Sequence, residues 1–170
     1  LGLDVKGNIY VADTGGTRLV KLSPEGQLIQ VLVTGGKGRG QVDQPTDAAV
    51  DDLGRVYVAE PMSGRVQVLD ASGAYLGEWP IAGANTTDSP HLDLDAAGRI
   101  LVTDPEGHRV IAFSPQGQAL GEWGGEGVAP GQFRKALGVG VGPDGLGAVT
   151  DLLNHRVQVF SIAGLVGASE

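Results

Sequence analysis

The sequence predicts an all-β fold of four-stranded sheets that repeat along the chain, and two features carry this prediction. The first is a segment that occurs four times: a hydrophobic strand ending in an acidic residue, a short turn, and an arginine that opens a second hydrophobic strand. The second is the period, because the four arginines are 47, 44 and 47 residues apart. A period in the mid-forties made only of strand patterns is typical of β-propeller blades. The paired strands cover residues 9–13 and 18–20, 56–60 and 65–68, 100–104 and 109–113, and 147–151 and 156–160.

Composition agrees with a single β-domain. The chain has 170 residues, of which 29 are glycine and 41% are hydrophobic. Many glycines beside short β-branched runs are typical of strands joined by tight turns. No segment shows the period of a helix, so we expect no helices. We expect one propeller domain over residues 1–170, with blades at about residues 1–34, 44–80, 89–124 and 132–168.

The second repeat shows the four strands of a blade most clearly. They are expected at residues 48–51, 55–59, 65–69 and 74–79. Gly54 marks the first turn, where a positive φ is expected, and Gly73 ends the last hairpin. Aromatic residues that recur at fixed blade positions are expected to pack against neighbouring strands: Tyr10, Tyr57, Trp79 and Trp123.

These repeats resemble the NHL family, which is named for an Asn-His-Leu stretch. Three stretches match the family pattern closely: Pro130-Gly131-Gln132-Phe133, Lys6-Gly7-Asn8-Ile9-Tyr10-Val11-Ala12-Asp13 and Asn154-His155-Arg156-Val157-Gln158-Val159-Phe160. The resemblance covers the whole chain in four copies and implies a β-propeller used mainly for binding and assembly. Some relatives with similar blades are enzymes, namely a peptide-amidating lyase, lactonases and bacterial lyases.

The number of repeats departs from the family pattern, because a full NHL propeller is expected to have more than four blades, about six. We therefore expect this chain to be a fragment of a longer protein. A four-bladed ring and an open arc completed by a second copy are the alternatives. An open arc leaves blade faces and strand edges uncovered, which favours self-association.

The residues that recur in every blade suggest a structural role before a chemical one. Charge-assisted hydrogen bonds between a repeated acid and a repeated arginine would tie strands or neighbouring blades together. His108 and His155 precede two of these arginines, as the NHL motif implies, and are interpreted in the same way. The repeat acids and arginines are Asp13 and Arg18, Glu60 and Arg65, Asp104 and Arg109, and Asp151 and Arg156.

Three polar residues break the repeat and are the candidate metal ligands. When the first strands are aligned on their turn glycines, Asp47 and His91 share one position, and Asp93 lies two residues further on. First strands line the central channel of a propeller, so strand alternation sends these side chains toward the axis. Two carboxylates and an imidazole can bind a divalent cation or act as acid and base. The alternative is that they are solvated polar residues in a wet channel.

Charge and cysteine content narrow the function classes. The net charge is −8 and the 12 basic residues are spread along the chain, so we expect no nucleic-acid binding. No stretch reaches the roughly 18 apolar residues typical of a membrane span. The chain has no cysteine, which excludes a disulfide framework and thiol chemistry. The compartment stays open, with an extracellular or periplasmic bacterial domain favoured.

These observations predict a non-catalytic binding or scaffolding module that contacts a protein or a small ligand through one propeller face. The contact surface would use loops at the strand ends, which differ between blades. Two alternatives stay open: a lyase- or lactonase-like enzyme with a metal in the central channel, and an arc that self-associates through its open ends. No cofactor is expected apart from the divalent cation of the first alternative. The loops cover residues 14–17, 61–64, 105–108 and 152–155, together with the crossovers between blades.

Overall fold

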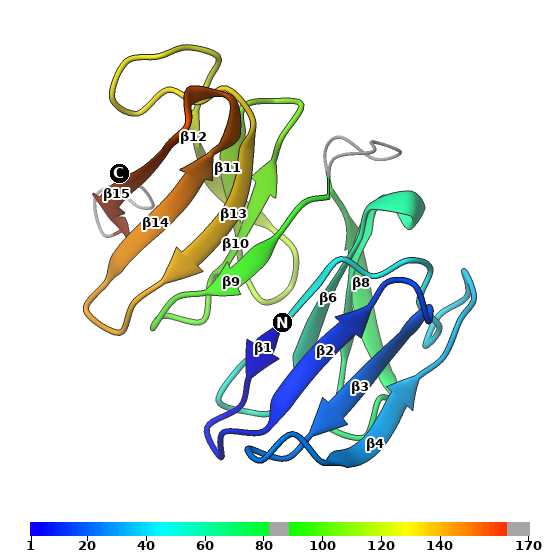
Figure 1. Cartoon of the computed structure of the whole chain (residues 1–170). Coiled ribbons are helices and arrows are strands. Elements are labelled where there is room, and N and C mark those ends of the chain that lie inside the picture. The colour runs from blue at the N-terminus through cyan, green and yellow to red at the C-terminus, as the bar shows by residue number, and fades with distance from the viewer. Residues whose placement is uncertain (82–88, 163–170) are drawn as a thin grey trace. The chain divides into compact units, whose positions relative to one another are not determined.

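The fold is all-β, as the repeat predicts, and is seen in a computed structural model that describes residues 1–81 and 89–162. Fifteen strands in these residues form four antiparallel sheets (Figure 1). In every sheet, strands that are neighbours in sequence are also hydrogen-bonded neighbours. This meander is the topology of a propeller blade, and the chain carries four such blades.

Each blade is named by its order in the chain. Blade 1 contains β1 (Gly2–Leu3), β2 (Ile9–Asp13), β3 (Arg18–Leu22) and β4 (Leu28–Val33). Blade 2 contains β5 (Asp47–Val50), β6 (Val56–Glu60), β7 (Arg65–Leu69) and β8 (Tyr75–Pro80). Blade 3 contains β9 (Leu92–Leu94), β10 (Ile100–Asp104), β11 (Arg109–Phe113) and β12 (Ala119–Gly124). Blade 4 contains β13 (Ala136–Val141), β14 (Leu146–Asp151) and β15 (Arg156–Ser161).

Two details of the blades differ from the sequence-based expectations. The described part of blade 4 has three strands, and the end of the predicted fourth blade, up to residue 168, lies outside the described residues. No α-helix occurs in the described residues, where the helical segments are single 3-10 turns at η1 (Pro61–Ser63) and η2 (Leu152–Asn154). Each turn ends at a residue with left-handed backbone, Gly64 or His155. Three residues are too few to show a helical period in the sequence.

The chain divides into two compact units, Leu1–Thr86 and Thr87–Glu170, and each holds two blades. In unit 1, Tyr10, Leu19 and Leu32 of blade 1 share a buried cluster with Val56 and Val58 of blade 2. We call the side of a blade at the Tyr10 and Leu19 positions its front face, and the side at the Val56 and Val58 positions its back face. The front of blade 1 therefore covers the back of blade 2.

Unit 2 repeats this packing. Leu101 and Val110 on the front face of blade 3 share a cluster with Val149 on the back face of blade 4, with Phe160 packed against it. Trp123 also packs there, with its ring centroid 5.3 Å from that of Phe160 in an edge-to-face arrangement. The side chains expected to pack do so, since Tyr10, Tyr57 and Trp79 are buried and Trp123 is half-buried. No helix of the described residues has the length and apolar character needed to cross a membrane.

An aspartate caps the turn after the first strand in blades 1 to 3. In blade 1, Asp4 Oδ1 accepts hydrogen bonds from the backbone of Lys6 and of Asn8, both at 2.9 Å. Its other oxygen lies 3.2 Å from Lys21 Nζ. Burial would raise the pKa of Asp4, but the hydrogen bonds from Asn8, Lys21 and Lys6 lower it to about 2.

This shift predicts a pH-dependent contribution to stability from Asp4. The ionised form favours the folded state, so the contribution is complete above the reference pKa of 3.8 and is lost as the pH falls toward 2. Its size is about 2 kcal/mol. Asp4→Asn is expected to lower the free energy of unfolding by that amount at pH 7 and to match the wild type near pH 2. Urea unfolding at a series of pH values measures this, with Asp52→Asn at an exposed turn position as the charge-matched control. Parallel pH profiles for wild type and Asp4→Asn would contradict it.

Candidate functional site

Each repeat acid lies within hydrogen-bond distance of the arginine of its own blade. The shortest distances from arginine Nε to the carboxylate are 2.7 Å in blade 1, 3.1 Å in blade 2, 2.9 Å in blade 3 and 2.7 Å in blade 4. The cross-strand register explains this, because the acid ends one strand and faces the arginine that opens the next: Asp13 and Arg18, Glu60 and Arg65, Asp104 and Arg109, and Asp151 and Arg156. All four acids therefore serve the same local contact.

In blade 2, the pair Glu60 and Arg65 also holds the loop that leads into the blade. This first crossover loop covers residues 34–46. Arg65 Nη2 donates to the carbonyls of Gly38 and Gln41, at 3.1 and 3.0 Å. Gln67 Nε2 donates to the Gln41 carbonyl at 2.9 Å and to Glu60 Oε1 at 3.0 Å. The remaining Glu60 oxygen accepts from the backbone N–H of the loop, which fixes the loop to the blade.

Blade 4 holds the second crossover loop, residues 125–135, with the same contacts. Arg156 Nη2 donates to the Gln132 carbonyl at 2.8 Å, and Gln158 Nε2 donates to the same carbonyl at 2.7 Å. Asp151 Oδ1 accepts from Arg134 N at 2.7 Å. The two glutamines both lie two residues after a repeat arginine. That spacing is visible in the sequence, but our sequence analysis did not include them.

One position distinguishes the two loop contacts. Asn154 in blade 4 donates from Nδ2 to the Gly127 carbonyl and to Asp151, both at 2.9 Å. The equivalent residue in blade 2 is Ser63, whose side chain has two fewer heavy atoms and reaches one bond less far. Its hydroxyl is buried and makes no hydrogen bond to any described residue. Blade 2 therefore lacks the side chain that fills this corner in blade 4.

The pKa values of the two repeat carboxylates, Glu60 in blade 2 and Asp151 in blade 4, shift in opposite directions. Burial raises the pKa of Glu60, although Arg65, the backbone of Asp43 and Gln67 oppose it. For Asp151 burial also raises the pKa, but the hydrogen bond from Asn154 and those from Arg134 and Arg156 lower it overall. The pKa of the blade 2 carboxylate is thus raised by burial, whereas that of the blade 4 carboxylate is lowered by its hydrogen bonds.

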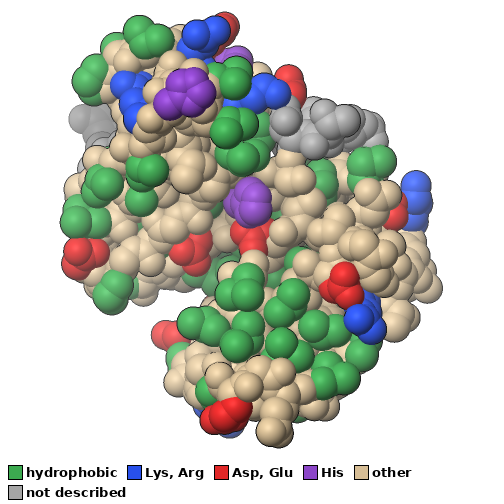
Figure 2. Space-filling view, viewed as in Figure 1, with side chains coloured by type: hydrophobic (Ala, Val, Ile, Leu, Met, Phe, Trp, Pro, Cys, Tyr) green, Lys and Arg blue, Asp and Glu red, His purple; other side chains and the backbone are tan. Residues whose placement is uncertain are grey.

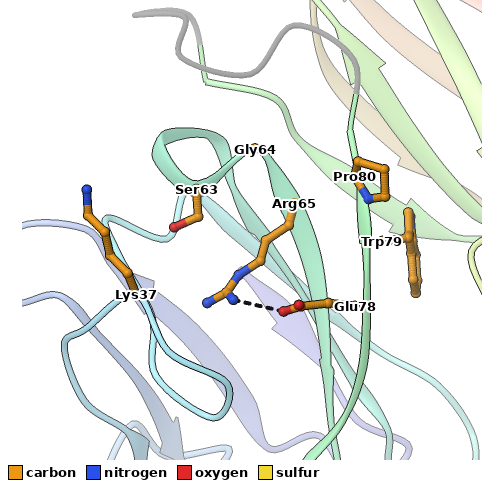
Figure 3. A pocket seen from close by; sticks show the side chains of 7 residues that line it. All are labelled: Lys37, Ser63, Gly64, Arg65, Glu78, Trp79 and Pro80. Carbon is orange, nitrogen blue, oxygen red and sulfur yellow. Dashed lines mark hydrogen bonds and ion pairs between the residues drawn. The ribbon is translucent and has the colours of Figure 1, made fainter.

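An open depression of about 530 Å³ lies at this corner of blade 2 (Figure 3). Lys37 of the first crossover loop borders one side, Trp79 and Pro80 of β8 the other, and Ser63 lies between them (Figure 3). The depression also contains the ion pair between Arg65 Nη1 and Glu78 Oε2, at 2.8 Å. Its walls thus combine a cation, an ion pair and an apolar edge. Sequence reasoning placed a contact surface at residues 61–64 but did not locate the depression.

The lysine of the depression is available to a ligand. Its side chain is 78% exposed, and its contact with Asp43 is long, at 3.5 Å. The arginine, by contrast, is committed to Glu60, Glu78 and two loop carbonyls. A negatively charged group would therefore meet Lys37 before Arg65.

The structure places all three candidate metal ligands in hydrogen bonds, His91 through its backbone N–H, which donates to Thr103 Oγ1 at 2.8 Å. Asp47, in unit 1, accepts from the backbone N–H of Ala48 at 3.0 Å and pairs with the N-terminal ammonium. Asp93, in unit 2, accepts from Leu94 N at 2.8 Å and Val141 N at 2.7 Å. Across residues 1–81 and 89–162, no group of three or more His, Cys, Asp or Glu is arranged to hold a metal ion. A site formed by Asp47, His91 and Asp93 stays a prediction.

The histidines next to the repeat arginines take part in backbone geometry. His108 and His155 both have positive φ, at 55° and 51°, at the turn before the arginine. His108 Nδ1 accepts a hydrogen bond from Lys135 N at 3.1 Å. This bond ties the second crossover loop of unit 2 to blade 3.

Comparison with known proteins gives a sequence relative in two mammals. No family model matches the chain. Human NHL repeat-containing protein 3 is 35% identical over 77 residues, which cover 43% of this chain and 22% of the relative. The repeats of this chain are thus similar in sequence to those of an NHL repeat-containing protein. The mouse protein of the same name is 35% identical over 83 residues, covering 46% of this chain and 24% of the relative.

The chain thus spans about a quarter of the length of the curated relatives it matches. Solved structures agree on the fold of the NHL repeats. A chain of the nidogen/laminin complex has a TM-score of 0.72 at 15% identity, covering 96% of this chain and 60% of that one. A streptogramin B lyase has a TM-score of 0.63 at 15% identity, covering 93% and 52%. At these identities the likeness shows the fold alone. The relatives are from human and mouse, and a bacterial source stays a prediction.

Proposed function

We propose that this NHL chain is a non-catalytic binding module that contacts its ligand at the strand ends of blade 2. The observation that carries the proposal is the depression at Ser63. The contacts that hold the crossover loop recur in blades 2 and 4, but Ser63 does not fill the corner that Asn154 fills in blade 4. The Glu60 carboxylate beside the depression has a structural role, since both of its oxygens accept hydrogen bonds from Arg65 and from other groups. A carboxylate held in this way is a poor candidate for acid–base chemistry.

The tips of the two crossover loops differ in chemistry although the same contacts hold both loops, which supports a role in recognition. Lys37 and Arg39 occupy the first tip, whereas Val128 and Pro130 occupy the equivalent positions of the second. Binding residues are commonly carried on loops that a rigid scaffold positions. The basic tip, together with the unfilled corner, makes blade 2 the proposed contact site.

The walls of the depression define the ligand chemistry. An anionic group would pair with Lys37, and an apolar group would lie against Pro80. A peptide segment with an acidic residue beside an aliphatic or aromatic one has both features. A small amphipathic anion has the same chemistry and is the alternative ligand source.

Selection from a random peptide library displayed on phage tests this proposal. The affinity of each selected peptide for the protein is then measured by isothermal titration calorimetry. We expect acidic-apolar peptides whose affinity falls about tenfold with Lys37→Ala, because a hydrogen bond to a charged group is lost. Ser63→Asn is expected to weaken binding as well, since asparagine fills this corner in blade 4.

Val128→Ala is the matched control, because it shortens the equivalent tip residue of the other crossover loop. It is expected to leave peptide affinity unchanged. Peptides that bind equally well to wild type, Lys37→Ala and Ser63→Asn would place the contact elsewhere and overturn the proposal. Failure to select any peptide, with small amphipathic anions also giving no heat in the calorimetric titration, would do the same.

A further inference from the structure

The outer strand of blade 2 contributes a carboxylate to the depression. The Glu78 side chain is 30% exposed, and its Oε2 pairs with Arg65 Nη1 at 2.8 Å. Its other oxygen, Oε1, lies 3.8 Å from Arg39 Nε at the tip of the first crossover loop. Figure 3 shows the Glu78 carboxylate pointing from β8 toward the Arg65 guanidinium, on the side that faces Lys37. A ligand group that pairs with Lys37 therefore enters beside a negative charge.

Two residues of β8 hold Arg39 at the loop tip. The guanidinium carbon of Arg39 lies 5.4 Å from the centroid of the Tyr75 ring, within the range of a cation–π contact. The second contact is the one with Glu78. Next to Arg39 in the chain, Gly40 N donates to Gln67 Oε1 at 2.7 Å, which fixes the backbone of the tip. Arg39 thus already has a carboxylate and an aromatic ring beside it within blade 2.

Positive and negative charges around the depression are balanced. Each of three cations lies beside a carboxylate of the same unit: Lys37 beside Asp43, Arg39 beside Glu78, and Arg65 beside Glu60. In the view of Figure 2, the basic side chains visible on unit 1 likewise lie beside acidic ones. One added negative charge can pair with Lys37, whose contact with Asp43 is long, at 3.5 Å. A second added charge would meet two arginines that already have carboxylates beside them, and Glu78 would repel it.

We infer that Glu78 makes the depression select a singly charged carboxylate over a doubly charged phosphate. This inference rests on the proposed function, because it concerns the anionic group of the ligand bound at that site. A phosphorylated serine carries a charge of about −1.5 to −2 at pH 7, whereas an ionised glutamate carries a single charge. Removing the charge of Glu78 leaves Arg39 and Nη1 of Arg65 available to the ligand. Glu78→Gln is therefore expected to shift the preference toward the phosphate.

Glu122 of blade 3 provides the control for this change. It occupies the equivalent position of β12 and pairs with Arg109 Nη1 at 2.9 Å, with its side chain 56% exposed. Both glutamates lie in the same Leu-Gly-Glu-Trp stretch of their blade. Glu122→Gln thus removes the same charge and the same kind of ion pair at a residue that does not line the depression. It is expected to leave the affinity for every peptide unchanged.

Calorimetric titration with three synthetic peptides tests this inference. The peptides share one selected acidic-apolar sequence and carry glutamate, phosphoserine or glutamine at the acidic position. We expect the wild type to bind the phosphoserine peptide more weakly than the glutamate peptide. Glu78→Gln is expected to tighten binding of the phosphoserine peptide about tenfold and of the glutamate peptide about threefold, because a like charge is removed from the site. Its affinity for the glutamine peptide is expected to stay unchanged. Urea unfolding checks that both variants are folded.

The outcomes separate this inference from the proposed function. A glutamate peptide that binds Lys37→Ala as tightly as the wild type would overturn the proposed function and this inference with it. A glutamate peptide that depends on Lys37, with equal gains for both charged peptides in Glu78→Gln, would overturn this inference alone. So would a wild type that binds the phosphoserine peptide more tightly than the glutamate peptide, or the same gain in Glu122→Gln. An equal gain for the glutamine peptide would do so as well, because charge would not be its cause.

Discussion

Replacing Glu60 with alanine is expected to lower the free energy of unfolding by about 3 kcal/mol, because it breaks a buried ion pair and leaves Arg65 with Glu78 as its remaining carboxylate partner. The Glu60 side chain is 0% exposed and Arg65 is 11% exposed, so little water can replace the lost carboxylate. Gln67 and the backbone N–H of Asp43 lose acceptors at 3.0 and 2.9 Å in the same step. The substitution thus breaks both the cross-strand pair and the attachment of the first crossover loop.

The matched control lies in the same chain. Asp13→Ala removes the equivalent acid of blade 1, whose pair with Arg18 is 32% and 49% exposed. An exposed pair contributes about 0–1 kcal/mol, so we expect a small change. Urea unfolding followed by circular dichroism measures both variants at pH 7. Equal losses for Glu60→Ala and Asp13→Ala would show that burial of the pair does not determine its contribution.

Local pattern was enough to predict the strands of this protein. The repeated acid, turn and arginine gave β6, β7, β10 and β11 to within a residue, because alternation and turn glycines are written in short stretches of sequence. Burial on both faces was not predicted. β6 and β10 are buried at every residue, although their sequence pattern is equally typical of a strand that is buried on one face. The second face of each strand is covered by packing between elements. The sequence pattern within one strand does not predict that packing.

The candidate site illustrates the same limit. Sequence reasoning looked for exceptions to the repeat and found Asp47, His91 and Asp93, because their polar character stands out in the first strands. The exception that borders the depression is a smaller one, serine in place of asparagine, at Ser63 and Asn154. Its effect depends on how far a side chain reaches across a loop. That distance follows from the folded crossover loop and has no signature in composition or spacing.

The second large effect is expected from Phe133→Ala, which removes the apolar anchor of the second crossover loop. Phe133 is 1% exposed and belongs to the buried cluster of unit 2, although it lies on a loop between β12 and β13. Truncating a buried phenylalanine costs about 3–5 kcal/mol, through lost burial and the cavity left behind. Urea unfolding measures the loss. Val128→Ala in the same loop, at a residue 67% exposed, is expected to change stability by no more than about 0.5 kcal/mol.

Because Phe133 anchors the second crossover loop, Phe133→Ala is also expected to increase local opening of that loop. The backbone of Phe133 donates to Gly125 O at 2.9 Å and accepts from Gly127 N at 3.1 Å, so the loop closes around the ring that the core holds. Without the ring, these bonds lose the burial that keeps water away, and amide hydrogen exchange in residues 125–135 is expected to accelerate. Exchange in the first crossover loop, which Arg65 and Gln67 hold by polar contacts, is expected to stay slow. Equal acceleration in both loops would mean that the ring supports the whole chain rather than its own loop.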